Sequence, residues 1–214
     1  MKLLLATRSE GKFRELERLF ADTPIQLLSL RDLRVSTSAA EEGLETSTRL
    51  VDNALAKARY FHGLTGLPTL ADDSGLAVDA LDGEPGVRSK RYAPPELQAE
   101  LGESEANMVC LLRALETVAD AERTAHFDCV MALVLDDEEQ VFDGRVDGVI
   151  LREPQGDGGF GYDPLFLLPE RGMTTAELLP VEKNEISHRG QAARKVRAWL
   201  LARLGAETPA PEDQ

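Results

Sequence analysis

Hydrophobic runs and polar turns alternate along the chain in an order that predicts an α/β protein. Residues 2–6 form a continuous apolar run of strand length, and beyond Lys12 the apolar residues recur at helical spacing. Residues 25–30 predict a second short strand, and a second helix is predicted from about residue 48 to residue 60. Strands that alternate with helices in this way are typical of α/β folds.

The second half of the chain predicts a different kind of strand pairing. Two long stretches, residues 125–135 and 140–151, are separated only by an acidic turn, which predicts an antiparallel hairpin. Residues 68–71 predict a buried strand that ends abruptly at Asp72, and residues 165–168 predict one more short strand. We therefore expect a mixed sheet rather than a purely parallel one.

Length and composition favour one globular unit. The chain has 214 residues, of which 43% are hydrophobic and 29% charged, and this composition is close to that of ordinary folded domains. We expect residues 1–205 to form a single domain and residues 206–214 to be a flexible C-terminal tail.

Charge and hydropathy exclude several classes of protein. The formal net charge of −14 argues against DNA or RNA as a partner, because nucleic-acid binding requires an extended basic surface. No apolar run approaches the roughly 18 residues of a membrane span, so we expect no membrane contact and a cytoplasmic location. Cys110 and Cys129 are far apart in apolar stretches, and we interpret them as buried free thiols.

The turn between the first strand and the first helix carries candidate phosphate contacts. Backbone N–H groups at a helix N-terminus, together with the helix dipole, favour an anion above the strand end. The side chains of Thr7, Ser9 and Lys12 add further donors. The turn is not a Walker loop, because the Gly-Lys-Ser/Thr ending is absent. The alternative is an ordinary capped helix with Lys12 in solvent.

Two adjacent carboxylates follow the predicted strand 68–71. Neighbouring residues in an extended chain point to opposite faces, so only one of them should point into a cleft, and we favour Asp73 over Asp72. A magnesium ion requires one or two carboxylates together with substrate phosphate oxygens, and Glu45 is a second candidate ligand. The alternative is an Asx-type turn that simply closes the strand.

The glycine-rich segment 156–164 combines a flexible backbone with aromatic residues. Glycine permits close approach to a ligand, and an aromatic ring such as Phe160 can stack on a base. In the alternative interpretation Phe160 and Tyr162 only fill the core.

Three potential cations lie before or within the first turn of the last helix, which Ser187 is expected to cap. Lys183, His188 and Arg189 there oppose the helix dipole, so a nearby anion or base edge would stabilise them. An intramolecular carboxylate would explain these cations equally well.

Taken in order, these segments resemble the inosine triphosphate pyrophosphatase family, also called XTP/dITP diphosphatases. The resemblance covers about residues 2–200. Its most specific parts are Ala-Asp-Asp-Ser-Gly-Leu at 71–76, Gly-Gly-Phe-Gly-Tyr-Asp-Pro at 158–164 and Ile-Ser-His-Arg-Gly at 186–190.

The resemblance implies an elongated, two-lobed α/β homodimer with a mixed central sheet and an active site in the cleft between the lobes. It implies magnesium-dependent hydrolysis of ITP, dITP and XTP to the monophosphate and pyrophosphate. Asp73 matches the catalytic base and a metal ligand, and Glu45 matches the second metal ligand. The positions that match the triphosphate-binding turn are Thr7, Arg8, Ser9, Glu10, Gly11 and Lys12. The remaining positions that match substrate contacts are Ser74, Phe160, Gly161, Tyr162, Asp163, Lys183, His188 and Arg189.

Some residues depart from the family pattern or leave alternatives open. Ser9 stands where the turn usually has asparagine, and Glu41 and Glu42 are rival metal ligands to Glu45. A Maf-like pyrophosphatase for pyrimidine or modified nucleotides is a second enzymatic interpretation. A nucleotide sensor without catalysis is a third.

Overall fold

One open sheet organises the protein, and residues 1–206 are described in this computed structural model. Its strands follow the order β2-β1-β3-β5-β6-β7-β8, and β4 pairs beside β3. The strands are β1 (Lys2–Leu5), β2 (Gln26–Ser29), β3 (Thr69–Val78), β4 (Pro85–Gly86), β5 (Thr124–Val134), β6 (Glu139–Ile150), β7 (Phe166–Leu168) and β8 (Met173–Thr174). The α-helices are α1 (Glu10–Phe20), α2 (Leu50–Thr65), α3 (Pro95–Leu101), α4 (Glu103–Ala114), α5 (Pro180–Ile186) and α6 (His188–Ala206). Of the predicted tail, residues 206–214, Ala206 ends α6 and residues 207–214 lie outside the described residues.

The predicted mixed sheet is confirmed. Strand β1 pairs in parallel with β2 and β3, whereas each successive pair from β3 through β5, β6 and β7 to β8 is antiparallel. The predicted hairpin corresponds to β5 and β6, which pair along their whole length. No helix within residues 1–206 has the length and apolar composition that a membrane span requires.

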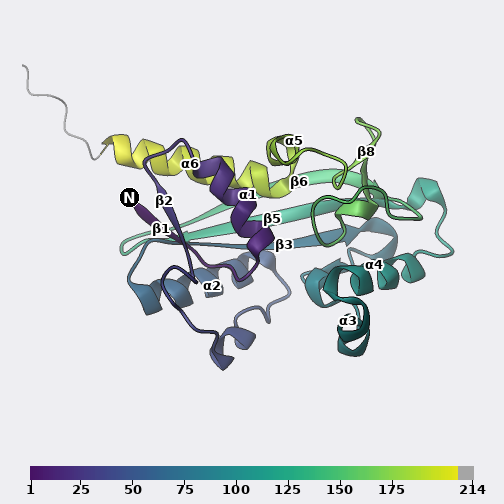
Figure 1. The fold of residues 1–214 in the computed structure, drawn as a ribbon, viewed down its shortest axis with the longest axis horizontal. Helices are drawn as coiled ribbons and strands as arrows, with labels where there is room; N and C mark the ends of the chain where they lie inside the picture. Colours follow the sequence, from purple (N-terminus) through teal and green to yellow (C-terminus); the bar gives the residue numbers. More distant parts are fainter. Residues whose placement is uncertain (207–214) are drawn as a thin grey trace, which may run out of the picture.

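Helices cover both faces of the sheet. Side chains alternate between the two faces along each strand, so each face has apolar residues to bury. Leu3 and Leu5 belong to a core cluster with α1 and α6, whereas Leu4 belongs to a cluster with α2 on the opposite face. A third cluster around Leu111 and Phe166 fills the end of the molecule that carries α3 and α4. Figure 1 shows the resulting elongated shape, with α1, α2 and most of α6 toward one end and α3 and α4 toward the other.

Strand β3 corrects one sequence prediction. The predicted strand ends at Asp72, but β3 continues through this residue to Val78, because all ten of its residues pair with β5. On the other side, β1 pairs only with Thr69 and Leu70, and β4 pairs only with Leu76 and Ala77. The edge of β3 between these two contacts therefore lacks a neighbouring strand, and it carries the two carboxylates.

The helices also differ in part from the predictions. Helices α3 and α5 were not predicted, and Lys183 lies within α5. The predicted cap of the last helix is confirmed, since the Gly190 N–H donates to Ser187 Oγ at 3.1 Å.

The first turn of α6 lies very close to β6 because residue 144 is glycine. A Cβ atom built on Gly144 would lie 2.1 Å from the backbone oxygen of His188, far inside contact distance. The Gln191 amide donates to the carbonyl of Arg145 at 2.7 Å, which fixes the helix to the strand. This packing determines where the residues at the start of α6 lie.

Candidate active site

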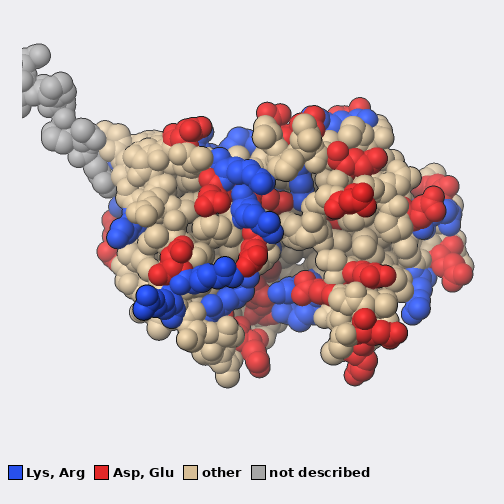
Figure 2. Space-filling model, in the orientation of Figure 1, with Lys and Arg blue, Asp and Glu red and all other residues tan. Residues whose placement is uncertain are grey.

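A cleft of about 270 Å³ opens beside the unpaired edge of β3. Helices α1 and α2, which follow β1 and β2, cover opposite faces of the sheet, so β1 and β3 flank a topological switch point. In α/β sheets, ligands bind at such points. Figure 2 shows charged side chains of both signs around a hollow near the middle of the face shown.

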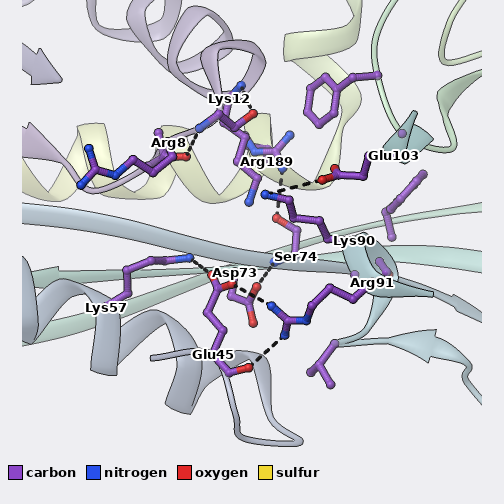
Figure 3. A pocket seen from close by; sticks show the side chains of 18 of the residues that line it. Arg8, Lys12, Glu45, Lys57, Asp73, Ser74, Lys90, Arg91, Glu103 and Arg189 are labelled. Atoms are coloured by element: carbon purple, nitrogen blue, oxygen red, sulfur yellow. Dashed lines mark hydrogen bonds and ion pairs between the residues drawn. The ribbon is translucent and has the colours of Figure 1, made fainter. Parts of the chain in front are cut away.

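Most of the predicted site residues line this cleft. They are Thr7, Arg8, Ser9, Lys12, Glu45, Asp73, Ser74, Phe160, Gly161, Tyr162, Asp163, Lys183, His188 and Arg189. Glu10 and Gly11 do not line it. The cleft is also lined by Lys57, Lys90, Arg91 and Glu103, which were not predicted as site residues and are labelled in Figure 3.

Asp73 is mostly buried and faces the cleft on the α2 side of the sheet. Its Oδ2 accepts a hydrogen bond from the Asn53 side chain at 2.9 Å, and its Oδ1 accepts one from the Ser74 N–H at 3.1 Å. Burial raises the pKa of Asp73 above its usual value and nearby Glu45 adds to this, although Lys57 and the Asn53 hydrogen bond oppose it. A carboxylate with a raised pKa is a better proton acceptor.

Glu45 lies beside Asp73 and is held by two cations (Figure 3). It forms a close ion pair with Lys57 and a second one with Arg91 Nη1 at 3.6 Å. Burial alone would raise the pKa of Glu45, but Lys57 contributes most to lowering it overall. Glu45 is therefore ionised.

The pair of carboxylates fits a magnesium ion that is completed by a substrate. Within residues 1–206 no group of three or more His, Cys, Asp or Glu side chains could hold a metal on its own. Magnesium is usually bound through one or two carboxylates together with phosphate oxygens and water. Glu45 and Asp73 supply two such carboxylates on one wall of the cleft.

Asp72 lies on the opposite face of β3 and is completely buried. Its Oδ2 contacts Lys12 Nζ at 2.9 Å and Arg189 Nε at 3.3 Å, and it accepts a hydrogen bond from Ser74 Oγ at 3.0 Å. Burial would raise the pKa of Asp72, but Lys12 and Arg189 hold it well below the usual range. Asp72 is therefore ionised and forms ion pairs with Lys12 and Arg189.

Carboxylates of the chain itself satisfy the cations near the start of α6, as one of the two open alternatives predicted. Lys183 Nζ contacts Glu15 Oε1 at 2.9 Å and Asp163 Oδ2 at 2.6 Å, and Arg189 Nη1 contacts Glu15 Oε2 at 2.7 Å. Burial would raise the pKa of Glu15, but Arg189 and Lys183 lower it overall. The sequence analysis did not propose Glu15 as a site residue.

His188 is buried and uncharged. Its ring stacks on Phe127 with centroids 4.8 Å apart and an interplanar angle of 11°. Burial, with contributions from Arg189 and Lys183, lowers the pKa of His188 well below its ordinary value. Its Nδ1 has no hydrogen-bond partner within the part of the chain that the structure describes. A neutral imidazole offers one donor and one acceptor to a ligand.

The two aromatic residues of the glycine-rich segment differ in their surroundings. Tyr162 is buried and donates its hydroxyl to the Ser89 carbonyl at 2.8 Å, so it fills the core. Phe160 is 37% exposed, and its ring centroid lies 4.9 Å from Lys183 Nζ and 5.5 Å from the Arg189 guanidinium carbon. Phe160 therefore presents aromatic surface to the cleft above buried cations.

The fold and the cleft define an α/β protein with a charged site at a topological switch point. Residues 3–199 match the model of the Ham1 family. The chain belongs to this family.

Relatives at high identity carry an enzymatic name. The dITP/XTP pyrophosphatase of Thioalkalivibrio sulfidiphilus is 49% identical over 207 residues, which cover 95% of this chain and 98% of that protein. The dITP/XTP pyrophosphatase of Geobacter sulfurreducens is 47% identical over 192 residues, which cover 89% and 92% respectively. The resemblance to the inosine triphosphate pyrophosphatases is therefore confirmed.

Solved structures agree on the fold. A HAM1 protein from Coxiella burnetii has a TM-score of 0.81 and 39% identity, covering 94% of this chain and 99% of its own. A nucleoside-triphosphatase and dITP/XTP pyrophosphatase from Mycobacterium abscessus has a TM-score of 0.69 and 42% identity, with the same coverage.

Proposed function

We propose that this protein hydrolyses ITP, dITP and XTP between the α- and β-phosphates, releasing the nucleoside monophosphate and pyrophosphate. The observation that carries this function is the composition of the cleft. One wall carries the proton acceptor Asp73 beside Glu45, and the same cleft contains the open ring of Phe160 and the neutral His188. The names of the relatives support the substrate class.

The chemical step requires one activated water molecule and no covalent intermediate. Asp73 accepts a proton from water as the water oxygen bonds to the α-phosphorus, and the bond from that phosphorus to the bridging oxygen breaks. Lys12 and the N-terminus of α1 hold the departing pyrophosphate. Lys57, which the sequence analysis did not single out, lines the same wall and adds positive charge.

Magnesium is the cofactor we propose for Glu45 and Asp73. When bound with the triphosphate, it would neutralise negative charge on the phosphate oxygens. The geometry supports Glu45 over Glu41 as the second ligand, because Glu45 is close enough to Asp73 to raise its pKa, whereas Glu41 is paired with Arg8.

Base selection is proposed to occur around Phe160 and His188. The ring of Phe160 stacks on the purine, and hypoxanthine and xanthine present an acceptor oxygen at the 6-position, where adenine has a donor amine. His188 supplies one N–H for this oxygen. A buried donor left unpaired by adenine would cost about 1 to 3 kcal/mol.

A single assay tests the function. The protein is incubated with magnesium and a panel of ITP, dITP, XTP, GTP and ATP, and the products are identified by phosphorus NMR. We expect monophosphate and pyrophosphate from the first three, with much slower turnover of GTP and ATP. Release of orthophosphate, or equal turnover of all five, would contradict the proposal. Binding without turnover would instead indicate a nucleotide sensor.

The assembly is also a proposal. We propose that residues 1–205 act as one catalytic unit and that the protein is a homodimer, which membership of the family supports. Light scattering on the purified protein measures the oligomeric state. The cytoplasmic location stays a prediction, and the comparisons give the Maf-like alternative no support.

A further inference from the structure

Arg8 belongs to the predicted phosphate-binding turn, but its side chain is engaged with another segment of the chain. Nε and Nη2 donate to the two carboxylate oxygens of Glu41 at 3.0 and 2.7 Å. Nη1 donates to the carbonyl of Val35 at 2.8 Å, and Nη2 also donates to the carbonyl of Ser36 at 3.2 Å. These four bonds occupy most of the five N–H groups of a guanidinium. Little donor capacity remains for a phosphate.

The segment that Arg8 holds has few other anchors. The 3-10 helix η1 (Ala39–Gly43), which carries Glu41, contains no buried residue. Ser38 hydrogen-bonds the Tyr60 hydroxyl at 2.9 Å, the Val35 N–H donates to the Leu30 carbonyl at 2.9 Å, and Val35 and Leu44 pack partly against the hydrophobic cluster under α2. Because apolar burial is small here, the polar contacts of Arg8 contribute a large share of what orders this segment.

This segment leads directly to Glu45, and the Glu45 backbone carbonyl accepts a hydrogen bond from Arg91 Nη2 at 3.0 Å. Lys57 and Arg91 pair with the Glu45 carboxylate itself, and the segment before Glu45 fixes where its backbone lies along the cleft. Figure 3 shows the Arg8 side chain pointing away from Lys12, whose Nζ contacts Asp72 at 2.9 Å.

We propose that Arg8 is a positioning residue, whose guanidinium fastens residues 35–41 to the turn after β1 and thereby holds Glu45 beside Asp73. The proposal rests on the proposed function, in which Glu45 binds the metal. A bidentate arginine–carboxylate pair fixes orientation as well as distance, which a lysine cannot do. Partners that orient a metal ligand typically change metal affinity or activity by about 10- to 100-fold when removed.

The test compares Arg8→Ala, Glu41→Gln and the double variant with the wild type. Arg31→Ala is the matched control, because Arg31 forms a similarly short ion pair with Glu10 at 2.6 Å that does not touch residues 35–45. Two quantities are measured: hydrogen exchange of residues 35–45 without metal or substrate, and ITP turnover as a function of magnesium concentration.

We expect faster exchange across residues 35–45 in all three test variants. We also expect a magnesium requirement raised by about 10-fold, at the low end of the range for such partners, with kcat at saturating magnesium close to that of the wild type. The double variant should show the same hydrogen exchange and the same magnesium requirement as either single variant, since both substitutions remove the same Arg8–Glu41 pair. Arg31→Ala should leave both quantities unchanged.

The opposite pattern overturns the proposal. If Arg8→Ala raises the KM for ITP while exchange and the magnesium requirement stay at wild-type values, Arg8 contacts the triphosphate instead. If Arg8→Ala fails to fold, Arg8→Lys and Glu41→Gln decide the question, since each keeps a similar volume but removes the bidentate pair. If the wild type proves inactive, the proposed function fails, but hydrogen exchange still decides whether Arg8 orders residues 35–41.

Discussion

Asp72 and Asp73 are neighbours on one strand with the same side chain, yet their surroundings make them chemically opposite. On the α6 side, Lys12 and Arg189 contact Asp72 directly and lower its pKa. On the α2 side, Asp73 has a neutral hydrogen-bond partner in Asn53, shares its environment with Glu45 and has a raised pKa. Both carboxylates are buried, so charge rather than burial distinguishes them.

The difference shows how one strand can serve structure on one face and chemistry on the other. The Asp72 face is a network in which each charge already has partners. The Asp73 face keeps a carboxylate short of positive charge, which a metal ion or a proton taken from water could supply. Four predictions test this division.

The largest expected effect is the loss of turnover in Asp73→Asn. The substitution keeps the shape but removes the basic oxygen, and general-base help is typically worth about 10² to 10⁴ in rate. We expect kcat for ITP to fall by at least about 10², with a circular dichroism spectrum like that of the wild type. Near-normal turnover at saturating magnesium would show that another residue is the base.

The second prediction concerns the stability of Asp72→Asn. The substitution leaves Lys12 and Arg189 short of a buried anion, and breaking a buried ion pair typically costs about 3 to 5 kcal/mol. We expect a loss near 3 kcal/mol by urea denaturation, because asparagine keeps a hydrogen-bond acceptor. A folded, fully stable but inactive variant would reverse the assignments of the two carboxylates.

Phe160→Ala tests whether the Asp72 face supports base binding rather than the chemical step. Phe160 lies above Lys183 and Arg189, and stacking on a base is worth about 1 to 3 kcal/mol. We expect KM for ITP to rise by roughly 5- to 150-fold with little change in kcat. An unchanged KM with a lowered melting temperature would make the ring a packing residue.

The smallest expected effect is on the pH dependence of stability without magnesium. Because the folded state raises the pKa of Asp73, folding favours its protonated form, and wild-type stability should decrease as pH rises through that pKa. Asp73→Asn should therefore be slightly more stable than the wild type at neutral pH. Folding lowers the pKa of Asp72, so its contribution to stability is lost only as pH falls. Urea denaturation in EDTA across acidic to neutral pH measures both, and a less stable Asp73→Asn would contradict the prediction.

The sequence predicted the fold well where the local pattern determined the element. Residues 2–6 and the hairpin 125–151 are apolar or alternating, and both form strands. The length of β3 was not predictable, because two aspartates are poor strand residues unless distant cations neutralise them. Lys12 and Arg189, which neutralise Asp72, come from α1 and α6.

The site was predictable as far as unusual local composition marked it. The glycine-rich segment with Phe160 and the paired aspartates stood out and line the cleft or its floor. Lys57 and Glu15 did not, because each lies in an ordinary amphipathic helix. The partner of Glu15, Lys183, is 168 residues away in the sequence, so only the folded chain brings their charges together.

Gly144 makes the position of His188 and Arg189 depend on a residue that lies outside the cleft. Because a Cβ at this position would lie 2.1 Å from the His188 oxygen, any other side chain would push the start of α6 outward by about 1 Å or more. His188 and Arg189 would move with it, and Arg189 would move away from Asp72. Under the proposed function, variation at position 144 would therefore change base selectivity without touching the ligand, and a search confined to ligand-contacting residues would miss it.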